Sequence, residues 1–246
     1  MQENKRLRIF AGPNGSGKST LFNEFKKNYN PGYFVNADEL ERLLSTTGLI
    51  DLNAFDISAD FKDLEVFSKT KEAKTLITKA REEGHIIDIE IKENFIVDKA
   101  KDTHSYEASF AASFIRKLLY KKRKSFSFET VMSHPAKLEE IKKAQKAGYK
   151  TYLYFVCTDN AEINIGRVNN RVEQGGHSVD VNKIKSRYAK TLLNLYPTIQ
   201  LASRVYLFDN SGKTLELIAE ISEGVLQLKV NILPVWFIEF VLPHYL

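Results

Sequence analysis

Residues Gly12 to Ser19 read Gly-Pro-Asn-Gly-Ser-Gly-Lys-Ser, and this stretch decides the fold. It matches the phosphate-binding pattern G-x-x-x-x-G-K-[ST], whose glycines let the backbone curl so that several N–H groups point at one phosphate chain. In this pattern Lys18 reaches the β- and γ-phosphates, and the Ser19 hydroxyl takes a Mg²⁺ coordination position. The residues expected to bind the nucleotide are Gly12, Pro13, Asn14, Gly15, Ser16, Gly17, Lys18, Ser19 and Thr20.

The flanks of this loop agree with the motif. Residues 7–11 read as a short buried strand, and residues 20–28 read as a helix with one apolar face. A strand, a glycine loop and a helix N-terminus bind phosphate because the helix dipole and its free N–H groups meet the anion there. A chance glycine loop is the alternative, but it would not require this strand and helix on either side.

Strands alternate with helices along most of the chain, which predicts an α/β fold of the P-loop type. We expect a mostly parallel sheet with helices on both faces, a C-terminal hairpin, and a helical or mixed insertion over residues 45–106. Within the insertion we expect a long polar helix over 58–81 and a hairpin joining 86–91 to 95–97. The other expected elements are strands at 33–36, 125–128, 151–156 and 205–208, helices at 38–44, 105–119, 135–146, 161–172 and 182–196, and a hairpin joining 216–221 to 225–230.

Composition is that of an ordinary globular protein, with 246 residues, 43% hydrophobic and 27% charged. The net charge of +5 is explained in part by a nucleotide-phosphate site, so it does not by itself predict a nucleic-acid partner. Cys157 is the one cysteine and lies in an apolar run, which predicts a buried, inert thiol. Residues 1–8 carry no apolar signal region, and the apolar residues 233–246 are too short to span a bilayer. We therefore expect a cytoplasmic protein with no membrane partner, closed by a C-terminal helix.

Acidic residues follow two of the predicted strands. In an open parallel sheet, ligands bind beyond the carboxyl ends of the strands. Asp38 is placed to accept the proton of an attacking hydroxyl or to hold Mg²⁺ through water, although an aspartate before a helix also serves as an N-cap. Glu129 is a candidate for binding substrate hydroxyls or the water shell of the metal, and Thr130 for donating to a phosphate. Simple solvent exposure of Glu129 is the alternative.

Three arginines surround a glycine turn. Arg167 and Arg171 are four residues apart and share a helix face, while Arg187 lies on the next predicted helix. Between them stands Gly175-Gly176-His177, typical of a hinge. Arginines around a hinged loop suit a lid that closes on a triphosphate and stabilises charge during transfer, with Arg171 among the catalytic candidates. A solvated helix face is the alternative.

A basic segment covers residues 116–124, which read Arg-Lys-Leu-Leu-Tyr-Lys-Lys-Arg-Lys. It is the one feature that suggests contact with nucleic acid. Few aromatic residues interleave with the charges, so a solvated helix end is the better interpretation.

The ordered set of motifs resembles the zeta-toxin family of P-loop kinases. The resemblance rests on residues 12–20, on Val-Asn-Ala-Asp-Glu-Leu (35–40), on Ser-Phe-Glu-Thr-Val-Met-Ser (127–133), on Arg-Val-x-x-Arg-Val-x-x-Gly-Gly-His-x-Val (167–179) and on Ile-x-x-Arg-Tyr (184–188). It implies a single P-loop kinase-like domain over residues 1–246, with the insertion at 45–106. The two helix arginines also look like those of adenylate-kinase-type enzymes, which implies Arg167 against the adenine and Arg171 on the phosphates.

The resemblance implies an activity: phosphorylation of a small-molecule hydroxyl with ATP or GTP and Mg²⁺. In that scheme Asp38 is the general base, Lys18 the phosphate clamp, Ser19 the metal ligand and Glu129 a substrate-side carboxylate. Characterised zeta toxins phosphorylate UDP-N-acetylglucosamine and are held off by a small helical antitoxin, so a nucleotide-sugar acceptor and an antitoxin partner are implied too. A polynucleotide 5′-hydroxyl kinase and a nucleotide-dependent switch remain the alternatives.

Overall fold

The computed structural model describes residues 5–175 and 178–246, and the chain divides into two compact units. One combines Met1–Gly32 with Ser127–Leu246, and the other is Tyr33–Phe126. Over the described residues, no helix combines the length and the apolar character needed to cross a membrane.

The first unit, called here the loop unit, is built on a mostly parallel sheet. Strand β1 (Arg6–Ala11) pairs in parallel with β7 (Lys150–Cys157), which pairs in parallel with β8 (Arg204–Asp209). Beyond β8 the strands β9 (Glu216–Ser222) and β10 (Val225–Leu228) run antiparallel and form the expected hairpin. The strand β6 (Phe126–Thr130) neighbours β1 on its other side, so the order is β10-β9-β8-β7-β1-β6. The predicted class of a mostly parallel sheet with a C-terminal hairpin is therefore confirmed.

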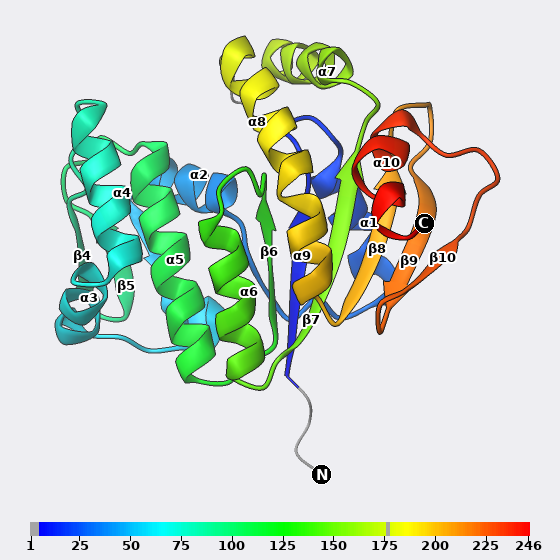
Figure 1. Ribbon diagram of the computed structural model, residues 1–246. Coiled ribbons are helices and arrows are strands. Elements are labelled where there is room, and N and C mark those ends of the chain that lie inside the picture. The colour runs from blue at the N-terminus through cyan, green and yellow to red at the C-terminus, as the bar shows by residue number, and fades with distance from the viewer. Residues whose placement is uncertain (1–4, 176–177) are drawn as a thin grey trace. The chain divides into compact units, whose positions relative to one another are not determined.

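Helices cover this sheet on both faces: in Figure 1, α6 and α9 lie in front of the strands and α1 lies behind them. Apolar side chains of β1 and β7 such as Leu7, Phe10 and Phe155 are fully buried between these layers. The C-terminal helix packs as expected, with Trp236 and Phe237 buried. The helices of the unit are α1 (Lys18–Asn28), α6 (Ala136–Lys146), α7 (Ala161–Glu173), α8 (Val181–Leu193), α9 (Leu195–Leu201), α10 (Val235–Phe240) and the 3-10 turn η2 (Leu242–His244).

The second unit, called here the insert unit, is organised around a long helix, α5 (Ser105–Lys121), most of whose side chains are buried. A small antiparallel sheet of order β3-β5-β4 accompanies it. The hairpin of β4 (Ile89–Lys92) and β5 (Phe95–Asp98) was expected, whereas β3 (Leu49–Asp51) was not. The remaining elements are β2 (Tyr33–Val35), α2 (Ala37–Thr47), the 3-10 turn η1 (Leu52–Phe55), α3 (Phe61–Ser68) and α4 (Lys71–Glu82). The inserted subdomain over 45–106 falls inside this unit and stays a prediction.

Two expected helices are each broken in two, and a side-chain cap explains the first break. The helix expected over 58–81 is wrong: α3 ends at Ser68, and Thr70 then accepts a hydrogen bond from the Ala73 N–H to begin α4. The helix expected over 182–196 is also wrong, because α8 ends at Leu193 and α9 begins at Leu195. The new start puts Pro197 in the first turn of α9, where its missing N–H costs no hydrogen bond.

The single thiol gives a first testable prediction. Cys157 at the end of β7 has no exposed surface, and burial raises its pKa. Because the thiolate is the reactive form, the native protein should not react with Ellman's reagent, whereas denaturant should release one equivalent of thiol. Rapid labelling without denaturant would contradict the buried, inert assignment.

Candidate nucleotide-binding site

The loop between β1 and α1 is built so tightly that its glycines cannot carry side chains. Gly12 has a φ of 146°, and a Cβ there would collide with the carbonyl oxygen of Val156 on β7. Gly17 has a φ of 104°, and a Cβ there would strike the side-chain amide of Asn210. Both positions combine a left-handed backbone with close approach of a neighbour, which only glycine tolerates. The expected curled loop is present.

The N-terminus of α1 is left open. Its cap residue is Gly17, no side chain accepts from its first N–H groups, and no acidic residue stands in its first turn. By contrast, α2, α3, α4, α7 and α8 all begin with a side-chain cap. The starts of α5, α6, α9 and α10 also lack a side-chain cap, but α1 is the one that follows the glycine loop. Its free N–H groups and the positive end of its dipole suit an anion bound in that loop.

Two buried polar atoms in the loop also point to a bound ligand at the start of α1. Ser16 Oγ and Asn14 Oδ1 are buried and have no hydrogen-bond partner among the described residues. Buried polar groups normally have partners, so each such exception calls for an explanation. A triphosphate with its Mg²⁺ and ordered waters fits this cradle, because it offers both acceptors and donors to the loop.

Lys18, Ser19 and Glu129 come together beside the loop. The Lys18 Nζ donates to the Pro13 carbonyl at 3.0 Å, so the side chain folds back across the loop. The Ser19 Oγ donates to Glu129 Oε2 at 3.2 Å. Gly12 N–H also donates to the Thr130 carbonyl at 3.3 Å, which ties the end of β6 to the start of the loop. The predicted metal ligand and the predicted acidic residue are therefore neighbours.

The turn after β8 also contacts the loop, and sequence reasoning missed its role. The Asn210 Nδ2 donates to the Ser16 carbonyl at 2.7 Å. Arg167 on α7 donates from Nη2 to the Gly212 carbonyl at 3.4 Å, so this predicted nucleotide contact lies at the same turn. The available signal is the polar run Asp-Asn-Ser-Gly at 209–212, directly after the strand β8.

The other predicted phosphate contacts lie on α7, on α8 and at the end of β6. Arg171 is exposed on α7, and Arg187 is half-buried on α8. The Thr130 hydroxyl accepts from the Met132 N–H at 3.1 Å and so shapes the turn after β6. From α8, Thr191 Oγ1 donates to the Val131 carbonyl at 2.7 Å and fixes this turn to the helix. Gly176 and His177 of the predicted hinge lie outside the described residues.

Asp38 belongs to the insert unit, where it is exposed in the first turn of α2. The cap of that helix is Asn36, whose Oδ1 accepts from the Asp38 N–H at 2.8 Å and from the Glu39 N–H at 3.3 Å. Capping therefore does not use the Asp38 carboxylate, which removes the N-cap explanation for this residue.

The basic segment 116–124 is largely engaged inside the insert unit. Arg116 lies 3.6 Å from Glu72, Lys121 lies 3.0 Å from Asp63, and Lys124 pairs with Asp56. The Lys124 ammonium, through that hydrogen bond, lowers the pKa of Asp56. Arg116 is buried, whereas Lys121, Lys122 and Arg123 are exposed, so the interpretation of a solvated helix end fits the C-terminal part of the segment.

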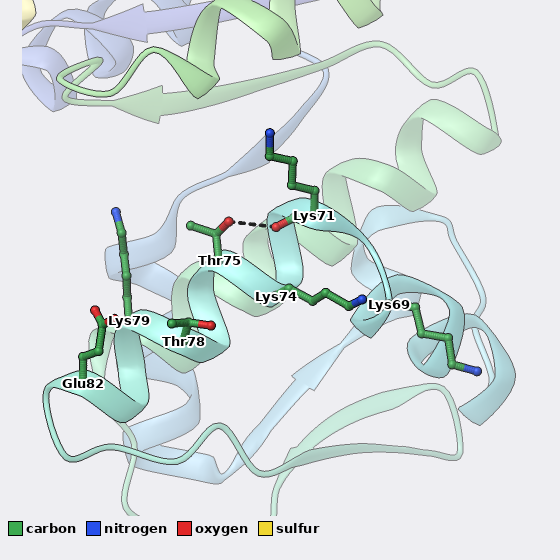
Figure 2. Close-up of a pocket in the computed structure, with 7 residues that line it drawn as sticks. All are labelled: Lys69, Lys71, Lys74, Thr75, Thr78, Lys79 and Glu82. Atoms are coloured by element: carbon green, nitrogen blue, oxygen red, sulfur yellow. Dashed lines mark hydrogen bonds between the residues drawn. The ribbon is translucent and has the colours of Figure 1, made fainter.

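A separate basic hollow lies on the same unit. Figure 2 shows that all of its lining comes from α4 and the residue two positions before it, and its volume is about 570 Å³. Within the described part of the chain, Lys71, Lys74 and Lys79 make no ion pair, whereas Lys69 pairs with Glu65 at 2.7 Å. The lining residues are Lys69, Lys71, Lys74, Thr75, Thr78, Lys79 and Glu82.

Comparison with known structures finds the same fold in two two-component systems, AvrRxo1 and PezAT. The AvrRxo1-ORF1:AvrRxo1-ORF2 complex with sulphate ions matches with a TM-score of 0.58 and 15% identity over 93% of this chain and 62% of that one. The same complex crystallised with ATP matches with a TM-score of 0.51 and 14% identity, over 93% and 61%. The PezAT chromosomal toxin-antitoxin system of Streptococcus pneumoniae matches with a TM-score of 0.51 and 11% identity, over 96% and 76%.

A sequence relative, an uncharacterized protein of Haemophilus influenzae, is 30% identical over 63 residues, which are 26% of this chain and 45% of that protein. The chain thus spans under half of that relative and about three-fifths of the AvrRxo1 chain.

The sheet order, the glycine loop and the open helix start define a P-loop protein. The family model for zeta toxin matches residues 85–215, just over half of the chain, and the chain belongs to the zeta-toxin family. Members of this family are P-loop phosphotransferases. The phosphate loop lies outside the matched residues, so it supports the assignment independently.

Proposed function

We propose that this chain is a kinase that uses Mg²⁺ with ATP or GTP to phosphorylate a hydroxyl of a small molecule in the cytoplasm. The observation that carries the proposal is the uncapped start of α1 behind a glycine loop, with Lys18 and Ser19 in its first turn. Bound there, Mg²⁺ would neutralise charge on the β- and γ-phosphates. Ser19 and the adjacent Glu129 would hold it, directly and through water.

Each residue of the proposed site would have a separate role in phosphoryl transfer. Lys18 would exchange the Pro13 carbonyl for the β- and γ-phosphates, and Arg171 and Arg187 would stabilise charge on the transferred group. Asp38 would accept the proton of the acceptor hydroxyl as its oxygen forms a bond to the γ-phosphorus. The bond from that phosphorus to the β,γ-bridging oxygen breaks, and the nucleoside diphosphate leaves. Arg167, at the Gly212 turn, would lie against the base.

The family suggests an acceptor and a partner. We propose a nucleotide sugar such as UDP-N-acetylglucosamine as the acceptor, with Glu129 and Thr130 as the substrate-side residues of this site. The inserted subdomain at 45–106 would supply the acceptor pocket or a partner surface. The AvrRxo1-ORF1 structure contains AvrRxo1-ORF2, and PezAT is a toxin-antitoxin system, which supports an antitoxin as the protein partner.

One observation favours a second candidate, a polynucleotide 5′-hydroxyl kinase. The hollow on α4 presents four lysines, three of them without ion pairs in the described part of the chain. Lysines that neutralise phosphates release counterions, so binding of an oligonucleotide should weaken steeply with salt. Salt-insensitive or absent binding would remove the polynucleotide kinase as a candidate.

The direct test is a phosphoryl-transfer assay. Protein and Mg²⁺–ATP or Mg²⁺–GTP would be incubated with nucleotide sugars, nucleosides, free sugars and 5′-hydroxyl oligonucleotides, and mass spectrometry would detect gain of one phosphoryl group. We expect a nucleotide sugar to be phosphorylated. Nucleotide turnover with no phosphorylated acceptor would instead support a nucleotide-dependent switch.

A further inference from the structure

The contact between Asn210 and the phosphate loop fixes a peptide plane. The side chain donates to the carbonyl of Ser16, and its own backbone N–H donates to the Cys157 carbonyl at 2.8 Å. A peptide unit is planar and trans, so its carbonyl and its N–H point in opposite directions. Holding the Ser16 carbonyl against Asn210 therefore directs the Gly17 N–H to the other side of the loop. This orientation is needed in a loop that binds phosphate with N–H groups.

The residue before Asn210 ties the same turn to the C-terminal helix. Asp209 accepts from the Ser211 N–H at 2.9 Å, from the Ser211 hydroxyl at 2.8 Å and from the Trp236 indole at 2.9 Å. Ser211 Oγ in turn accepts from the Asp159 N–H at 2.8 Å, and Asp159 accepts from the Val235 N–H at 2.9 Å. Two independent contacts thus hold α10 to the turn that contacts the phosphate loop.

Trp236 is placed to report on this network. It is the only tryptophan of the chain and is 1% exposed. Its ring packs on Phe155 of β7 with a centroid distance of 5.7 Å. The fluorescence emission of a buried indole that donates to a carboxylate changes when that carboxylate moves, because the interaction is strong in a low-dielectric interior.

We propose that Asn210 is a positioning residue of the nucleotide site and that the Asp209–Trp236 hydrogen bond couples helix α10 to that site. Nucleotide binding then changes the environment of Trp236 through Ser16, Asn210 and Asp209. The inference rests on the proposed nucleotide site and adds to it a C-terminal element that sets the geometry of the loop.

The test combines calorimetry with tryptophan fluorescence on the full chain. Wild type, Asn210→Ala and Asn210→Asp would be titrated with Mg²⁺–ATP, with Asn231→Ala, an exposed asparagine on the C-terminal segment, as the matched control. Loss of the Asn210 donor should weaken binding by about fivefold to tenfold, and the aspartate should do no better because it cannot donate. The control should bind as wild type does. Thermal unfolding of each variant shows that it is folded at the titration temperature.

Tryptophan fluorescence tests the coupling between α10 and the nucleotide site separately from the affinity for Mg²⁺–ATP. In wild type, saturation with Mg²⁺–ATP should shift or quench the Trp236 emission, and in Asn210→Ala at saturating nucleotide this change should be lost. Calorimetric binding with no emission change in wild type, or with the full change retained in Asn210→Ala, would overturn the coupling while leaving the nucleotide site intact. No calorimetric binding by wild type would overturn the site and the inference together.

Discussion

Lys18→Ala is expected to weaken the binding of Mg²⁺–ATP by about tenfold to a hundredfold, because it removes a charge-assisted contact to the terminal phosphates. The rate of transfer should fall further, by about 10²–10³-fold, since charge developing on the transferred group then lacks a preorganised cation. Calorimetry gives the first quantity and the phosphoryl-transfer assay the second. Affinity for the nucleoside monophosphate should change little, because Lys18 is expected to reach only the β- and γ-phosphates.

Lys26→Ala is the matched control for this variant. Lys26 is exposed in the last turn of α1, so its removal lowers the net charge by one unit on the same helix. If the two variants lost the same affinity, long-range charge rather than a local contact would explain the effect, and the role of Lys18 as a clamp would be wrong. Both proteins should unfold at temperatures near that of wild type, because exposed or half-exposed lysines contribute little to stability.

The phosphate loop could be predicted because everything that forms it is local. The glycines, Lys18 and Ser19 lie within eight consecutive residues, and the flanking strand and helix are recognisable from their own apolar patterns. The alternation of strands and helices likewise predicted the parallel sheet, since buried parallel strands read as continuous apolar runs.

The residues that contact the phosphate loop from other parts of the chain could not be predicted in the same way. Asn210 lies 194 positions from Ser16, and Glu129 lies 110 positions from Ser19, so only the folded sheet brings these pairs together. Helix breaks were missed for a different reason: the apolar periodicity runs on through Thr70 and Asn194. The Thr70 side chain caps the start of α4, and the Asn194 side chain donates to the Met132 carbonyl at 3.0 Å, a contact distant in sequence.

Asp38→Asn is expected to bind Mg²⁺–ATP as wild type does and to lose about 10²–10⁴-fold in the rate of transfer, the usual contribution of a positioned general base. The substitution keeps the size of the side chain and leaves Asn36, the cap of α2, in place. The result would therefore separate base catalysis from helix stability. The measurement is single-turnover transfer to the acceptor found in the assay, at saturating nucleotide.

Glu39→Gln is the control that gives this result its meaning. Glu39 stands next to Asp38 in the first turn of α2, is exposed, and has its N–H bonded to the same Asn36 oxygen. Each variant removes one negative charge from the positive end of the same helix, so each should lose a similar few tenths to about 1 kcal/mol of stability. A base at position 38 would make the two variants differ in transfer rate while both bind Mg²⁺–ATP as wild type does. If both variants kept the wild-type transfer rate, the proton would leave by another route. The kinase proposal would then need a different base, while its nucleotide site would be unaffected.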